Sequence, residues 1–374
     1  MPISWSLPGL LRLGFLFVVL ATSGCQSVSY YTQAVRGQYQ LWKRQTPIET
    51  LLAADDTPPA LKDRLALVLQ IRRFAETELK LPANGHYLRY ADLQRRFVVW
   101  NVYAAPEFSM TPKSWWYPVV GSLDYRGYFS EEKARAHAAE LQAGGFDTYI
   151  GGVTAYSTLG WFCDPVLNTF IDEPEADLAD LLFHELAHQR LFIPGDTEFN
   201  EAFATAVAEE GTRRWMGSRT NQIALAEYHR QSRRTAEFVE LVATARSQLD
   251  ALYTNAVGTF SSNDSHHQER ARQLRLEKQR IANELRQGYA DVKQRWGGQR
   301  DYDLWFSQPL NNAQLNTVDT YYKLVPAFRG VLRSVNGDLE KFFVVVESLR
   351  KLKKEERRVH LARLAANADQ AASE

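Results

Sequence analysis

Apolar residues recur every three or four positions along two stretches near the N-terminus, which predicts amphipathic helices. The first stretch follows Cys25 and ends at Pro47, and the second runs from about Pro59 to Leu81. From there to residue 171 the chain is rich in β-branched and aromatic residues and is punctuated by Gly and Pro, which is typical of strands. One helical segment, "SEEKARAHAAELQAG", interrupts these predicted strands.

Almost every segment after residue 172 has a helical pattern. A helix capped by Asp172 is expected to end at Pro194-Gly195, and two long antiparallel helices are expected between residues 219 and 297 around the turn "TFSSNDS". We therefore predict an α+β fold, in which a small mixed or antiparallel sheet packs on a predominantly helical body with a long helical hairpin.

The same boundaries divide the chain into five predicted parts. These are a signal peptide at 1–25, an N-terminal helical segment at 26–90, a core with an edge strand and the candidate site at 91–218, the helical hairpin at 219–297, and a C-terminal helical segment at 298–374.

The first part has the anatomy of an export signal. A single cation, Arg12, precedes a short apolar run, whereas spanning a bilayer core of about 30 Å takes roughly 20 apolar residues. Ser23-Gly24-Cys25 resembles a bacterial lipoprotein cleavage site, which implies lipidation of Cys25. With Gln26 rather than aspartate next, the resemblance implies anchoring in the outer membrane of the bacterial cell envelope, facing the periplasm. Cys163 is then a lone thiol, expected to be buried.

The charge balance disfavours one class of partner. Acidic and basic residues balance at 44 each, and the charges of the hairpin alternate in sign. This pattern favours a solvated surface over a nucleic-acid interface, so we expect no nucleic-acid partner.

The candidate chemistry lies in "FHELAHQRLF". On a helix His184 and His188 lie one turn apart on one face, where both imidazoles can bind one zinc ion. Glu185, rotated about 100° around the axis, can overhang the open position of that ion and act as a general base.

A catalytic zinc site needs a third protein ligand. The metzincin continuation would require glycine at 191 and histidine at 194, where this chain has leucine and proline. A second helix capped by Asp196 or Thr197 would return Glu201 to the two histidines across the tight "IPGDT" turn. Asp196 or Glu198 as the third ligand remains an alternative.

Asn200-Glu201 followed by small residues resembles the third-ligand signature of the gluzincin metallopeptidases. Six segments, "QAVRGQYQLW", "VVWNVYAAPEFSM", "YRGYF", "GWFCDPVLNTF", "LLFHELAHQRLFIPGDTEFNEAFA" and "TYYKLVPAF", together resemble a bacterial family described as zinc aminopeptidases and carried as envelope lipoproteins. The resemblance implies a gluzincin-like body, a Zn²⁺ cofactor, a peptide or protein substrate, and Tyr321 or Tyr322 as the donor that stabilises the transition state. This chain departs from the gluzincin pattern at Thr205, where aspartate is common, so Glu209 becomes a candidate for supporting a histidine.

Substrate binding is predicted from two requirements. An edge strand before the metal helix would pair with an extended peptide, which places Tyr156 beside the substrate, although an interior strand would explain the same residues. An aminopeptidase also needs a carboxylate for the free α-ammonium group, for which Glu107, Glu198 and Glu209 are candidates. Without such a carboxylate the enzyme would be an endopeptidase. Outside the enzymes, a non-catalytic envelope scaffold is the alternative.

Overall fold

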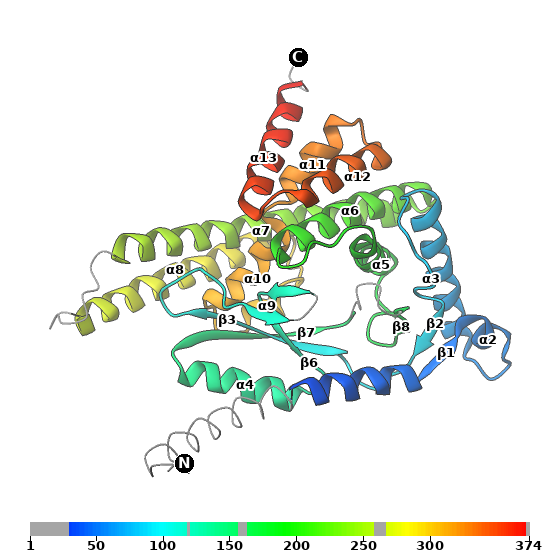
Figure 1. Cartoon of the computed structure of the whole chain (residues 1–374), viewed down its shortest axis with the longest axis horizontal. Helices are drawn as coiled ribbons and strands as arrows, with labels where there is room; N and C mark the ends of the chain where they lie inside the picture. The colour runs from blue at the N-terminus through cyan, green and yellow to red at the C-terminus, as the bar shows by residue number, and fades with distance from the viewer. Residues whose placement is uncertain (1–29, 118–119, 156–162, 258–266, 372–374) are drawn as a thin grey trace, which may run out of the picture.

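The structure is a computed structural model that describes residues 30–117, 120–155, 163–257 and 267–371. Small sheets of two and three strands lie beside a predominantly helical body, which confirms the predicted α+β fold (Figure 1). Cys25 and Tyr156 lie outside the described residues.

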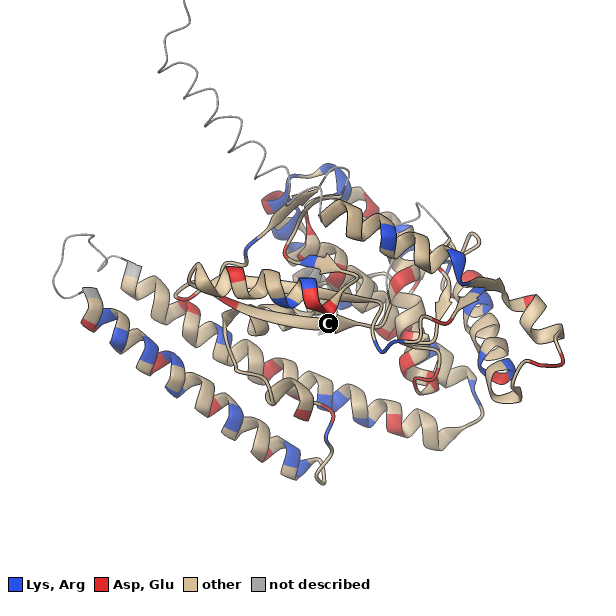
Figure 2. Cartoon of the chain, turned by 90° about the horizontal axis from the view of Figure 1, so that it is seen from below, with Lys and Arg blue, Asp and Glu red and all other residues tan. Residues whose placement is uncertain are grey.

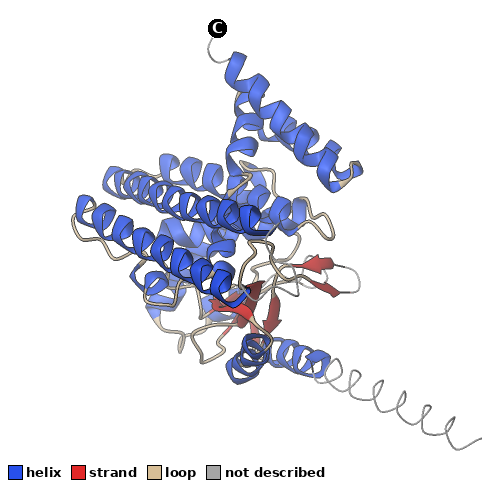
Figure 3. Cartoon of the chain, turned by 90° about the vertical axis from the view of Figure 1, so that its left-hand side faces the viewer, coloured by secondary structure: helices blue, strands red, loops and turns tan. Residues whose placement is uncertain are grey.

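The central sheet has the order β6-β3-β7 and is antiparallel throughout. It consists of β3 (Val99–Pro106), β6 (Arg126–Tyr128) and β7 (Phe146–Val153), each within a segment that the sequence predicts as strand. A second, mixed sheet joins β1 (Gln45–Pro47), β2 (Arg89–Ala91) and β8 (Val166–Leu167), and β4 (Trp115–Tyr117) pairs with β5 (Gly121–Leu123). Figure 3 shows the strands gathered between the N-terminal helix on one side and the helical body on the other.

Alternation along β3 gives the central sheet two different faces. Val102 and Ala104 are buried in one cluster with α4 (Glu131–Ala143). Asn101 and Tyr103 point the other way, toward the helices that carry the candidate site. The sheet is therefore one wall of the site and is braced from behind by α4.

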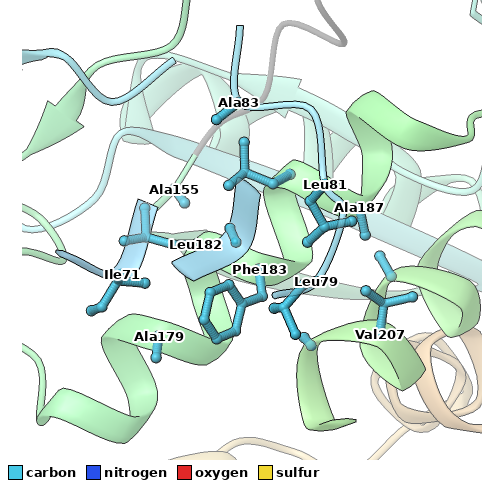
Figure 4. Close-up of a cluster of buried hydrophobic side chains, with 14 of the residues drawn as sticks. Ile71, Leu79, Leu81, Ala83, Ala155, Ala179, Leu182, Phe183, Ala187 and Val207 are labelled. Atoms are coloured by element: carbon cyan, nitrogen blue, oxygen red, sulfur yellow. The ribbon is translucent and has the colours of Figure 1, made fainter. Parts of the chain in front are cut away.

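The helices that carry the site form the centre of the main core. They are α5 (Glu175–Arg190) and α6 (Thr197–Ser218), with α3 (Pro59–Thr77) packed beside them. Figure 4 shows Phe183 against Leu79, and a Cβ atom at Gly211 would lie 2.8 Å from the Phe183 ring, so the absence of a side chain there permits the close packing. Asp172 does not cap α5, because the helix begins at Glu175 with Pro174 in the cap position.

The remaining helices surround this core. The predicted hairpin is confirmed as α7 (Gln222–Val257) and α8 (His267–Arg295), whose charges alternate along its length (Figure 2). The short α2 (Ile48–Ala53) and α9 (Asp303–Phe306) are followed in the C-terminal part by α10 (Asn312–Tyr322), α11 (Val325–Ser334), α12 (Leu339–Ser348), the 3₁₀ turn η1 (Leu349–Lys351) and α13 (Lys354–Ala371).

One buried cluster extends along the chain from Leu41 to Leu361, so the N-terminal, central and C-terminal segments share a core, whereas the hairpin has a smaller cluster with α10. Cys163 is exposed, so its expected burial is wrong. None of the described helices carries an apolar stretch long enough to cross a membrane.

Candidate metal centre

Helix α5 presents two imidazoles on one face. His184 and His188 are one turn apart, and their ring centroids lie 4.9 Å from each other. Their side chains are mostly enclosed, with 16% and 6% of the side-chain surface exposed. The two histidines therefore lie on one face of the helix, as their spacing in the sequence predicts and as two nitrogen ligands of one ion require.

Helix α6 supplies a carboxylate to the same point. The Oε2 atom of Glu201 lies 3.2 Å from Nε2 of His184 and 3.6 Å from Nε2 of His188. The position of Glu201 is set by its neighbour Asn200, whose side-chain amide is buried. This amide accepts a hydrogen bond from the Ile193 N–H and donates one to the Ile193 carbonyl, and both bonds are 2.8 Å long. This pair of bonds fixes the turn between the two helices and hence the register of Glu201 against the histidines.

These three side chains fit a divalent cation. One ligand atom from each lies within 4.8 Å of the others, and two imidazole nitrogens with one carboxylate oxygen are a donor set that zinc prefers. Burial alone would raise the pKa of Glu201, but the charge of His188 and hydrogen bonds from both histidines hold it well below its usual range. Burial alone would lower the pKa of His184, but the hydrogen bond and charge of Glu201 raise it. The site therefore holds a carboxylate anion that favours positive charge beside it.

The alternative third ligands are engaged elsewhere. Asp196 forms an ion pair with Arg357, and Glu198 pairs with Arg358 and lies 3.3 Å from Nζ of Lys323. Asp196 occupies the cap position of α6, but its side chain makes no capping hydrogen bond because Arg357 binds it. The geometry thus selects Glu201.

Glu185 lies next to the ligands but does not join them. It lines the same cavity as the two histidines and Glu201. Burial raises the pKa of Glu185, and the nearby charges of His184 and His188 offset part of that shift. A carboxylate with a raised pKa beside a candidate metal site suits a group that takes up and releases a proton.

The centre opens into a cavity of about 290 Å³. Tyr321, from α10, lines it with its ring centroid 6.1 Å from that of His184. The charge of Glu201, followed by burial, raises the pKa of Tyr321 well above its usual value, so the phenol keeps its proton and can donate it in a hydrogen bond. The other lining side chains are mainly apolar or aromatic, among them Tyr30, Val99, Tyr117, Tyr125, Phe129 and Phe192.

Three other predicted site residues are not among those that line the cavity. Glu107 accepts two hydrogen bonds from Arg275, at 2.6 and 2.9 Å, on the hairpin. Glu209 pairs with Arg329 at 2.6 Å. Tyr322 packs against both buried clusters.

Several residues in or beside the candidate centre were not predicted from the sequence. Asp180 lies one turn before His184, and burial raises its pKa to about 7 while the charge of His184 opposes that shift. Its spacing of four residues from the histidine was the available signal. Asn101 and Tyr103 on β3, and Tyr30 and Ala34 on the N-terminal helix, come from distant parts of the chain and gave no local signal.

Comparison with known proteins identifies the family of the chain. The model of the family "Putative aminopeptidase" matches residues 29–361, so the chain belongs to that family. The family name indicates a peptidase. No curated protein and no solved structure matches the chain.

Proposed function

We propose that this protein is a zinc-dependent metallopeptidase of the gluzincin type, acting as an aminopeptidase as its family name indicates. The observation that carries the proposal is the convergence of His184, His188 and Glu201 within 4.8 Å, next to Glu185 in a shared cavity. Three protein ligands leave one position for water or substrate, as catalytic zinc sites do.

The residues of the chain divide the work of peptide hydrolysis among them. Zinc held by the three ligands would supply Lewis-acid activation of water and of the scissile carbonyl. Glu185 takes a proton from the attacking water as its oxygen bonds to the carbonyl carbon, and then delivers that proton to the leaving nitrogen as the C–N bond breaks. The hydroxyl of Tyr321 donates a hydrogen bond to the carbonyl oxygen as negative charge develops there.

A second candidate is a zinc endopeptidase. It is favoured because the described residues that line the cavity include no carboxylate beyond the two of the candidate centre. Among the described lining residues the only acids are Glu185 and Glu201, both assigned to the centre. Glu107 and Glu209, expected to bind the substrate α-ammonium group, are paired with arginines instead. Recognition of a free N-terminus would then depend on other polar groups.

Peptides with free and with acetylated N-termini test the proposal and separate its two forms. We expect purified protein to hydrolyse at least one set, and a chelator to abolish the activity, because the centre needs its cation. Restoration by Zn²⁺ is the matched control. Cleavage restricted to free N-termini supports an aminopeptidase, and internal cleavage of blocked peptides supports an endopeptidase. Full activity after complete removal of metal would contradict both.

We also propose that the protein is anchored in the cell envelope through a lipid on Cys25. Cys25→Ser should convert a protein that only detergent extracts into one that a high-salt or alkaline wash releases, because the acyl chains are lost. Cell fractionation with immunoblotting measures this, and Cys163→Ser is the matched control. Unchanged resistance of Cys25→Ser to both washes would contradict lipidation at that position.

A further inference from the structure

The N-terminal helix, residues 30–43, exposes large apolar side chains along one face. Tyr31, Val35 and Tyr39 are 47%, 69% and 61% exposed, and Trp42 is 47% exposed. Spacings of four, four and three residues place them in a single row on a helix. We call these four side chains the outer stripe.

The opposite face of this helix is fixed to the protein. A Cβ atom at Gly37 would lie 2.2 Å from the Phe129 ring, and the side chain of Gln33 accepts a hydrogen bond of 2.9 Å from the Phe129 N–H. The guanidinium carbon of Arg126 lies 4.1 Å from the centroid of the Tyr30 ring. The helix therefore cannot roll the outer stripe inward without breaking these contacts.

Charge along the N-terminal helix has one sign. The chain carries no Asp or Glu from residue 26 to residue 48, and Arg36 and Lys43 are exposed beside the stripe. Aromatic side chains flanked by long cationic ones are typical of helices that lie in the interface of an anionic bilayer. A second copy of the chain fits this face less well, because a symmetric contact would bring the like charges together.

The stripe also begins close to the proposed anchor. Tyr31 follows Cys25 by six positions, and six residues span at most about 20 Å when fully extended. A lipid on Cys25 would hold this helix within about 20 Å of the membrane surface. From these observations we propose that the N-terminal helix lies on an anionic lipid surface, with the outer stripe in the headgroup region.

This placement has a consequence for the cavity, which rests on the proposed function. Tyr30 and Ala34, on the inner face of the same helix, line the cavity of the metal centre. Membrane contact and substrate cavity thus share one helix. The peptides that reach Glu185 would be those close to the bilayer surface.

Vesicle binding of the unlipidated mature chain, beginning at residue 26, tests the proposal. We expect it to cosediment with vesicles of phosphatidylethanolamine and phosphatidylglycerol. The triple variant Tyr31→Ser, Val35→Ser, Tyr39→Ser should bind at least about tenfold more weakly, because three apolar side chains no longer enter the headgroup region. The substituted side chains point to solvent, so circular dichroism should show an unchanged fold.

The matched control replaces Leu304, Val344 and Val359 by serine. These residues are similarly exposed, at 64%, 66% and 60%. Val344 and Val359 lie on α12 and α13, at the opposite end of the molecule from the N-terminal helix (Figure 1). The proposal would be overturned if the wild type did not bind vesicles, or if both triple variants lost the same fraction of vesicle binding. It would also be overturned if the wild type were a dimer that dissociated only in the stripe variant. Glu185→Gln should bind vesicles like the wild type, so this test is independent of peptidase activity.

Discussion

Glu185→Gln should lower turnover by about 10²- to 10⁴-fold and leave the zinc content near one ion per chain, because the amide fills the same volume but cannot accept the proton of the attacking water. The three ligands are untouched by the change, and Glu185 lines the cavity next to them. Steady-state kinetics together with elemental analysis of the same preparation measure both quantities.

The matched control for this variant is Glu131→Gln. Glu131 is an exposed carboxylate in the first turn of α4, where it pairs with Arg135, and it does not line the cavity. Its replacement should leave turnover within the error of the wild type. Wild-type turnover in Glu185→Gln would remove its role as general base, and loss of zinc along with activity would instead make it a structural part of the centre.

The geometry of the candidate metal centre was predictable where it depended on local sequence. A separation of four residues on a helix places His184 and His188 on one face wherever the helix lies in the fold. Glu201 was predictable because a tight turn between two helices leaves few arrangements, and the bonds from Asn200 to Ile193 select one of them. Short-range geometry therefore accounts for the convergence of the three candidate ligands.

The lining of the cavity beyond the two metal-site helices was not predictable, because it depends on long-range contacts. Asn101 and Tyr30 reach the cavity through strand pairing and helix docking between segments far apart in the chain. Glu107 shows the same limit, since its partner Arg275 lies 168 positions away and the sequence does not show that the carboxylate is engaged. Long-range pairing decides which polar residues remain available for a ligand.

The small sheet illustrates a further limit. Strand β3 has eight residues, most of them buried on both faces, and its β-branched and aromatic side chains indicate a strand from composition rather than from alternation. Strands β1 and β2 have three residues each, which is too few for a period to emerge. They form because they pair with each other and because β2 also pairs with β8. Tertiary contacts therefore decide where these strands begin and end.

Replacing any one of the three ligands should remove the metal. His184→Ala and Glu201→Ala are each expected to weaken zinc affinity by more than about 10²-fold. This exceeds the loss of affinity that follows when a residue that only orients a ligand is replaced. The reason is that two remaining ligands cannot hold the ion against water and buffer. Competition with a fluorescent zinc chelator measures the affinity directly, without any assay of activity.

Two further variants make this measurement decisive. Asp180→Asn should weaken zinc binding by only about 10- to 100-fold, because Asp180 lies one turn before His184 and is not one of the three candidate ligands. Glu198→Gln should keep wild-type affinity, since its carboxylate is held by Arg358 and Lys323. If Glu198→Gln lost zinc while Glu201→Ala retained it, the third ligand would be reassigned. If neither lost zinc, the ion would bind outside the pair of helices α5 and α6.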